Sequence, residues 1–243
     1  MNIKLYTFPN FVTLGNLLCG SVATLAASRG MLGEAFLLIV LAAVFDFLDG
    51  FFARLLHSYS ETGAELDSLA DLVSFGLAPT VMLLALYDIE AGGWMNIAGG
   101  ALLFSVVLFA ALRLARFNVD KSQHSEFRGL PVPAGALLIA SLTTGVEGLP
   151  NWALTLLAVV VAALMVSPIR MFALKFHGFG WRGNELRYCF IVLALVLLAT
   201  LGLRAIAAII VLYVVISAVR FFTVLHCRPI GEDETETEAG GKS

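Results

Sequence analysis

The sequence predicts an all-α membrane protein, a bundle of about eight transmembrane helices with both termini in the cytoplasm. Of its 243 residues, 59% are hydrophobic and only 14% are charged, and the mean hydropathy is +0.90. A soluble domain carries about 45–50% apolar and about 25% charged residues. The apolar excess is therefore too large for an ordinary core, and a chain of this length needs only one domain.

Eight segments are long and apolar enough to cross a bilayer, which takes roughly 20 helical residues. They are 8–28, 34–56, 64–87, 94–117, 130–147, 151–169, 185–202 and 204–225. The first is the weakest, because Asn10, Thr13 and Asn16 interrupt it. An alternative interpretation makes it a signal peptide, with Lys4 ahead of an apolar stretch. Pro9 followed by Asn10 is unusual in such a segment and favours a transmembrane helix.

The basic residues predict the orientation of these helices. With eight spans and a cytoplasmic N-terminus, thirteen of the fifteen Lys and Arg residues lie on the inner side. Only Arg29 and Arg204 fall outside. Because cytoplasmic loops carry an excess of Lys and Arg, we expect the loops 57–63, 118–129 and 170–184 in the cytoplasm.

The remaining composition excludes several classes of protein. We expect residues 1–228 to form the transmembrane domain and residues 229–243 an acidic, disordered cytoplasmic tail without apolar periodicity. The three cysteines have no paired spacing, so neither a disulfide nor a cysteine metal site is expected: Cys19, Cys189 and Cys227. The basic residues flank helix ends and form no stripe, so no nucleic-acid partner is expected.

Four aspartates lie within predicted spans, where an ionised side chain costs about 2.5–3.5 kcal/mol on insertion scales. Asp46 and Asp49 are three residues apart, and Asp67 and Asp71 are four apart. Either spacing places both members of a pair on one face of a helix. The short loop at 57–63 makes the two helices antiparallel neighbours. The four carboxylates should therefore meet at a similar depth.

Four carboxylates this close repel one another strongly in a low-dielectric interior, so protons or cations must neutralise them. Two divalent ions would balance the charge, and oxygen ligands suit Mg²⁺ or Mn²⁺. A single aspartate could equally be a helix cap or an interhelical hydrogen bond. A divalent cation transporter would also line its path with buried carboxylates.

The residues around the aspartates favour a phosphorylated ligand over a transported cation. Gly50 and Ala53 leave room beside the carboxylates, and Arg54 can pair with phosphate. Ser60 and Thr62 offer hydroxyls in the connecting loop, and Gly63 opens the next helix.

The pattern D-x2-D-G-x2-A-R-x8-G-x3-D-x3-D, from Asp46 to Asp71, resembles the signature of the CDP-alcohol phosphotransferase family without a departure. The resemblance implies a membrane helix bundle, usually a homodimer, with a two-metal site open to the cytoplasm. There a hydroxyl acceptor displaces CMP from a CDP-linked lipid or alcohol. It implies that Asp46 and Asp67 bridge both ions, Asp49 holds one ion and Asp71 the other, and that Asp71 is the catalytic base. It assigns these residues to the CDP-lipid: Gly50, Ala53, Arg54, Ser60 and Gly63.

Three further segments, 9–20, 113–118 and 127–134, resemble the phosphatidylserine synthase branch of the family. This resemblance implies CDP-diacylglycerol as donor, L-serine as acceptor and an enzyme of the cytoplasmic membrane. The motifs leave open glycerol phosphate, inositol phosphate or choline as acceptor, and an archaeal CDP-lipid as donor.

Polar residues of these segments extend the predicted site. Arg113, Arg116 and Arg128 predict a cationic cluster that could receive the serine carboxylate or a lipid phosphate. Alternatively, these arginines only extend to lipid headgroups. Asn118 belongs to this acceptor region or caps its helix. Two polar residues of the first segment, Asn10 and Thr13, are expected to contact the nucleotide or to cap the first helix.

Overall fold

The computed structural model describes residues 7–58, 60–119, 129–146, 148–169, 171 and 185–227, and within them every regular element is a helix. The α-helices are α1 (Phe8–Ser28), α2 (Leu32–Leu55), α3 (Glu61–Asp71), α4 (Ala78–Leu86), α5 (Gly93–Leu103), α6 (Ser105–Val119), α7 (Val132–Gly145), α8 (Asn151–Val166), α9 (Glu185–Leu201) and α10 (Ala205–Cys227). A π-helical segment, η1 (Leu72–Leu77), joins α3 to α4, and short 3₁₀ turns, η2 (Glu90–Gly92) and η4 (Gly202–Arg204), precede α5 and α10. The all-α prediction is confirmed for these residues.

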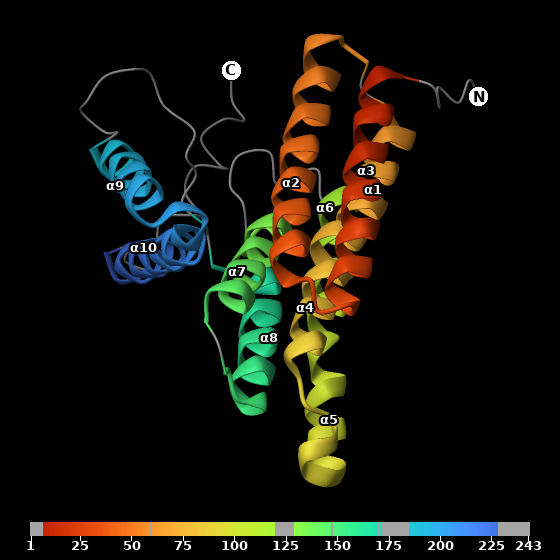
Figure 1. The fold of residues 1–243 in the computed structure, drawn as a ribbon. Coiled ribbons are helices and arrows are strands. Elements are labelled where there is room, and N and C mark those ends of the chain that lie inside the picture. Colours follow the sequence, from red (N-terminus) through yellow and green to blue (C-terminus); the bar gives the residue numbers. More distant parts are fainter. Residues whose placement is uncertain are drawn as a thin grey trace, which may run out of the picture.

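The helices form a bundle around the continuous α3–η1–α4 rod (Figure 1). The α1 helix packs along α2 and also contacts α3, η1 and α4. On the other sides of the rod, α6 and α7 contact η1, and α8 packs against α6. The last two helices, α9 and α10, lie to one side and reach the bundle mainly through α7.

Five candidate spans are long and apolar enough to cross a membrane, which indicates an integral membrane protein. They are Phe8–Ser28, Leu32–Leu55, Glu61–Leu86, Gly93–Val119 and Tyr188–Thr223. The segments predicted at 130–147 and 151–169 form shorter apolar helices, α7 and α8. The last two predicted spans correspond to α9 and α10, which together make up the fifth candidate. The number of crossings and the side on which each terminus lies stay predictions.

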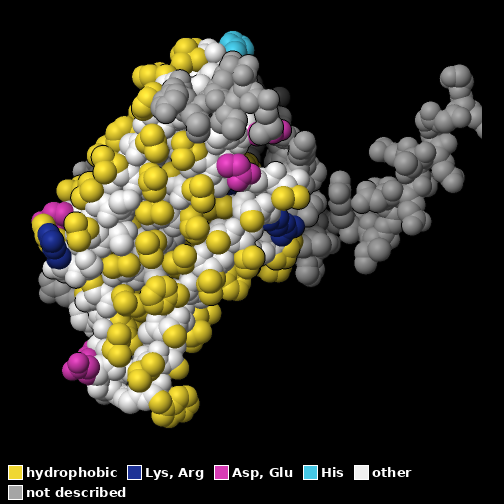
Figure 2. All heavy atoms as spheres, turned by 90° about the vertical axis from the view of Figure 1, so that its right-hand side faces the viewer, with side chains coloured by type: hydrophobic (Ala, Val, Ile, Leu, Met, Phe, Trp, Pro, Cys, Tyr) yellow, Lys and Arg dark blue, Asp and Glu magenta, His cyan; other side chains and the backbone are white. Residues whose placement is uncertain are grey.

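The α1 helix explains why its span looked weak in sequence. Its buried face carries Asn10, Thr13 and Asn16, whereas its exposed face carries Leu14 and Leu18. A helix that exposes leucine and buries asparagine faces hydrocarbon on one side and a polar site on the other. Figure 2 shows apolar side chains spread over this face of the molecule, with few charges between them.

Small residues allow the helices to approach closely. Alanines of the core, among them Ala23, Ala27, Ala35 and Ala42, are fully buried. Gly20 lies so close to Ser74 of η1 that an added Cβ would collide with the Ser74 backbone. This contact fixes α1 against the segment that directly follows Asp71.

The entry into α7 is set by a glycine turn and two prolines. Gly129 has a φ of +76°, and its backbone N–H donates to the Ile169 carbonyl at 2.9 Å. A Cβ there would also collide with the Met165 carbonyl oxygen. Pro131 and Pro133 then begin the helix, where proline is favoured. The turn holds both prolines beside the cavity described below.

Candidate functional site

Three of the four aspartates form a compact group between α2 and α3. Single carboxylate oxygens of Asp46, Asp49 and Asp67 all lie within 4.8 Å of one another. Asp46 and Asp49 come from the second half of α2, and Asp67 comes from α3. The predicted convergence of the two helices on one set of carboxylates is therefore present in the structure.

The surroundings of this group fit a divalent cation. The Thr13 hydroxyl of α1 donates to Asp49 Oδ2 at 2.6 Å and so orients that carboxylate. Asp67 Oδ1, by contrast, is buried without a hydrogen-bond partner among the described residues. An unsatisfied carboxylate oxygen beside two further carboxylates is costly unless a cation neutralises it. The group can hold a metal ion, and its oxygen donors suit Mg²⁺ or Mn²⁺.

Asp71, the predicted catalytic base, lies outside the three-carboxylate group but lines the same cavity. It is buried, and its Oδ1 accepts a hydrogen bond of 3.0 Å from Asn16 Nδ2 of α1. The π-helical segment η1 begins at the next residue. Such segments occur frequently at functional sites.

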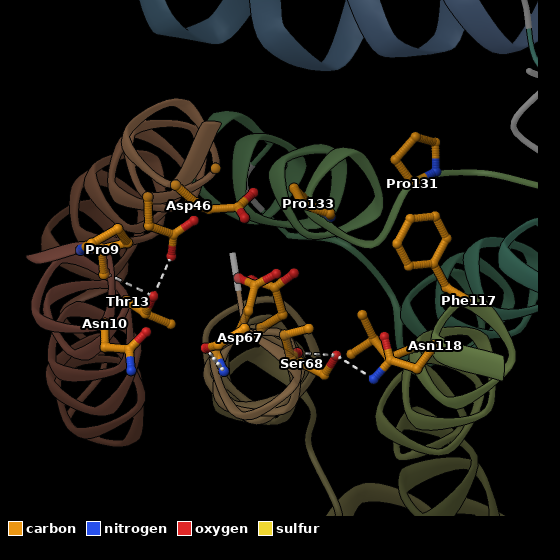
Figure 3. Close-up of a pocket in the computed structure, with 18 of the residues that line it drawn as sticks. Pro9, Asn10, Thr13, Asp46, Asp67, Ser68, Phe117, Asn118, Pro131 and Pro133 are labelled. Carbon is orange, nitrogen blue, oxygen red and sulfur yellow. Dashed lines mark hydrogen bonds between the residues drawn. The ribbon is translucent and has the colours of Figure 1, made fainter. Parts of the chain in front are cut away.

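The carboxylates open into a cavity of about 330 Å³ formed by α1, α2, α3, α6 and α7 and the loop residues between them (Figure 3). Its lining comprises Pro9, Asn10, Thr13, Asp46, Asp49, Gly50, Ala53, Ser58, Ser60, Gly63, Ala64, Asp67, Ser68, Asp71, Arg113, Leu114, Phe117, Asn118, Pro131 and Pro133. Figure 3 shows Pro9, Asn10 and Thr13 at one end and Phe117, Asn118 and Pro131 at the other, with Asp67 between. The cavity therefore has two ends that share the acidic centre.

The structure gives different reasons for a glycine at the two predicted positions, Gly50 and Gly63. A Cβ added to Gly50 would meet no atom within 4 Å, so the missing side chain leaves open space beside the carboxylates. A Cβ on Gly63 would lie 3.1 Å from both Asn10 Oδ1 and Ser60 Oγ. Gly50 thus leaves room for a ligand, whereas Gly63 lets α3 pack closely against α1.

Ser60 and Arg54 have structural partners of their own. The Ser60 hydroxyl accepts a 3.0 Å hydrogen bond from the Gly63 backbone N–H, so this residue is the N-cap of α3. Arg54 is exposed, and its Nε donates to the Gly50 carbonyl at 2.9 Å. Within the described part of the chain, Ser60 lines the cavity and Arg54 does not.

The predicted arginine cluster is divided. Arg113 lines the cavity, its Nε is buried without a hydrogen-bond partner among the described residues, and it interacts electrostatically with Asp71 and Tyr213. Arg116, one turn further along α6, is exposed and does not line the described cavity. Arg128 lies outside the described residues. Arg113 is therefore the arginine of the predicted set that the described structure places beside the carboxylates.

Asn118 connects two helices. Its Nδ2 donates to Ser68 Oγ at 3.0 Å and so ties the end of α6 to α3. The Asn118 side chain therefore does not cap its own helix in this structure, because it donates its hydrogen bond to a residue of another helix. It stands at the end of the cavity beside Phe117.

The prediction from sequence missed Asn16, Ser58 and Ser68. Ser58 lines the cavity with a buried hydroxyl that has no partner among the described residues. Asn16 follows Asn10 and Thr13 at helical spacing, which places all three on one face of α1. That polar stripe was the signal that could have assigned Asn16 to the site.

Comparison with known proteins agrees with this geometry. The CDP-alcohol phosphatidyltransferase family model matches residues 6–171. A Methanocaldococcus jannaschii protein named CDP-diacylglycerol–serine O-phosphatidyltransferase is 37% identical over 171 residues, which cover 69% of this chain and 74% of that protein. A Helicobacter pylori protein of the same name is 32% identical over 230 residues, covering 91% and 93%. An archaetidylserine synthase of Methanothermobacter thermautotrophicus is 36% identical over 168 residues, covering 66% and 67%.

The chain belongs to the CDP-alcohol phosphatidyltransferase family. The resemblance carried by the aspartate pattern is confirmed, and the competing interpretation as a cation transporter has no support from these relatives.

We expect Gly50→Ala to lower kcat/KM by about 10- to 100-fold, because its methyl group would occupy space available to the ligand. The fold should tolerate it, since a Cβ there meets no neighbour and alanine favours a helix. The matched control is Gly33→Ala, near the start of the same helix, where a Cβ also meets nothing. Activity and thermal unfolding would be measured for both variants. A wild-type kcat/KM in Gly50→Ala would show that the ligand does not occupy the space beside Gly50.

Proposed function

We propose that this protein transfers a phosphatidyl group from CDP-diacylglycerol to L-serine, giving phosphatidylserine and CMP. The serine hydroxyl oxygen attacks the lipid-side phosphorus, the bond from that phosphorus to the CMP oxygen breaks, and the hydroxyl proton passes to Asp71. The observation that carries the proposal is the acidic centre of the cavity, formed by the family's aspartate pattern. The names of the relatives support the donor and the acceptor.

All four aspartates would serve as metal ligands, and Asp71 would in addition act as the base. Asp46, Asp49, Asp67 and Asp71 would together hold two Mg²⁺ or Mn²⁺ ions. Bound there, the ions would neutralise the diphosphate and the charge on the departing CMP. The unsatisfied Oδ1 of Asp67 and the Thr13-oriented carboxylate of Asp49 support this assignment. Asp71 lines the same cavity without belonging to the three-carboxylate group, and a carboxylate in this position could accept a proton.

The CDP part would occupy the end of the cavity between α1 and the α2–α3 connection. Asn10 and Thr13 lie at this end (Figure 3), and the same cavity is also lined by Gly50, Ala53, Ser60 and Gly63. The Ser58 hydroxyl, which has no partner among the described residues, adds a donor that the sequence did not predict. Arg54, exposed on the next turn of α2, would have to leave its bond to the Gly50 carbonyl to reach a phosphate.

The acceptor would bind at the other end, with its carboxylate on Arg113. The buried Nε of Arg113, which has no partner in the part of the chain that the structure describes, provides a directed donor, and a guanidinium pairs well with a carboxylate. Its electrostatic interaction with Asp71 supports a serine held with its hydroxyl beside the base. Phe117 and Asn118 close this end. Arg116 and Arg128 would act on lipid phosphates or headgroups.

The protein would work as a homodimer in the cytoplasmic membrane, with the cavity open to the cytoplasm. The dimer rests on the family resemblance, and the orientation rests on the distribution of Lys and Arg. Because one relative is an archaetidylserine synthase, an archaeal CDP-lipid is a second donor to test.

An acceptor panel with purified protein, Mn²⁺ and CDP-diacylglycerol tests the proposal by following CMP release. The panel holds serine, glycerol 3-phosphate, inositol, inositol phosphate and choline, and we expect serine to give the highest kcat/KM. Arg113→Ala should raise the KM for serine by about 10- to 100-fold, the effect of losing a charge-assisted hydrogen bond, with kcat little changed. Arg116→Ala, on the exposed side of α6, is the matched control and should keep the wild-type KM for serine.

A larger kcat/KM for another acceptor would overturn the assignment of serine. An unchanged serine KM in Arg113→Ala would move the acceptor carboxylate elsewhere. Absence of CMP release with every acceptor and with both diacyl and archaeal CDP-lipids would overturn the transferase function.

The orientation is tested by thiol labelling of a variant whose three native cysteines are replaced by alanine. Single cysteines would be placed at two exposed glutamates, Glu61 at the start of α3 and Glu90 beside α5. We expect a membrane-impermeant reagent applied outside intact cells to label Glu90→Cys but not Glu61→Cys. The opposite pattern would contradict the cytoplasmic cavity.

A further inference from the structure

Asn16 is a fully buried polar side chain that contacts the proposed base directly. It lies on α1, and its Nδ2 donates to Asp71 Oδ1 at 3.0 Å. The amide orientation follows from this contact, since the alternative assignment would place the amide oxygen against the carboxylate. One carboxylate oxygen of Asp71 therefore already accepts a hydrogen bond from α1.

The backbone of Asn16 is also held. The Ser74 hydroxyl donates to the Asn16 carbonyl oxygen at 3.0 Å, and Gly20, one turn further along α1, packs directly against Ser74. Ser74 lies in η1, three residues after Asp71. The two hydrogen bonds thus fix α1 to the turn that carries the carboxylate, one through the side chain and one through the backbone of the same asparagine.

The other end of the Asn16 amide argues against a purely structural role. Its Oδ1 is buried and has no hydrogen-bond partner among the described residues. A buried acceptor without a partner costs free energy, and an apolar residue of the same size would avoid that cost. An asparagine at this place is explained by the single bond that it makes to Asp71.

We propose that Asn16 is a positioning residue, which holds Asp71 Oδ1 so that the second carboxylate oxygen is directed to the acceptor hydroxyl. The inference rests on the proposed function, because it assigns proton transfer to Asp71. Asn16 itself is not among the residues that line the cavity, so it acts through Asp71 and touches neither donor nor acceptor.

The test compares Asn16→Leu, which removes the N–H donor, keeps the branched shape of the side chain and adds volume, with Asn16→Ala, which removes both the donor and most of the volume. We expect both variants to lose about 10- to 100-fold in kcat, the range found when a group that orients a functional ligand is removed. The KM for serine and the Kd for CDP-diacylglycerol, measured separately by equilibrium binding, should stay within about twofold. Cys19→Ala, at a buried position one turn along the same helix, is the control for packing loss and should keep the wild-type kcat.

The outcomes separate this inference from the proposed function. Asp71→Asn is measured in parallel and should abolish turnover while CDP-diacylglycerol still binds. If Asp71→Asn is inactive but Asn16→Leu keeps the wild-type kcat, the positioning role is wrong and the proposed base stands. If Asp71→Asn keeps the wild-type kcat, the base assignment is wrong and the role of Asn16 falls with it. A kcat loss in Asn16→Ala that Asn16→Leu restores would assign Asn16 to packing and overturn the inference.

Discussion

The close approach of three carboxylates inside a helix bundle is the constraint on which the rest of the structure depends. Asp46, Asp49 and Asp67 bring their oxygens within 4.8 Å of one another in a region bordered by apolar spans. Like charges at this separation repel by several kcal/mol at the effective dielectric of a protein. The three carboxylates can stay this close only if cations or protons offset that repulsion. A protein whose function uses a bound cation has a reason to keep such a cluster.

The neighbouring helices are shaped by this acidic centre. The α1 helix buries its polar stripe toward the aspartates and exposes leucines, so that Thr13 reaches Asp49 and Asn16 reaches Asp71. The α3 helix begins at the Ser60 cap and continues through a π-helical segment, which carries Ser74 back to α1. These contacts give Asp49 and Asp71 different hydrogen-bond partners, which the proposed function uses to give Asp71 a role of its own.

Much of the site could be predicted because its geometry is local. Spacings of three and four residues fix which side chains share a helix face. The short connection between α2 and α3 brings the carboxylates of both helices to one cavity, while the two helices themselves pack mainly against α1. The rotation of α6 is not local. Arg113 and Arg116 are three residues apart, yet packing against η1 and α8 turns Arg113 to the cavity and leaves Arg116 exposed. The link from Asn118 to Ser68 likewise depends on a tertiary contact that periodicity does not contain. The Ser60 cap, by contrast, is a local bond to the Gly63 backbone N–H.

The most direct test of the acidic centre is equilibrium Mn²⁺ binding to the purified protein, followed by electron paramagnetic resonance with CDP-diacylglycerol present. The account predicts saturable binding of two ions per chain, reduced in Asp46→Asn and in Asp67→Asn. It predicts wild-type binding in Glu65→Gln, which removes an exposed carboxylate from the same turn of α3 as Asp67. Wild-type Mn²⁺ binding in Asp67→Asn, or no saturable binding to the native chain, would contradict it.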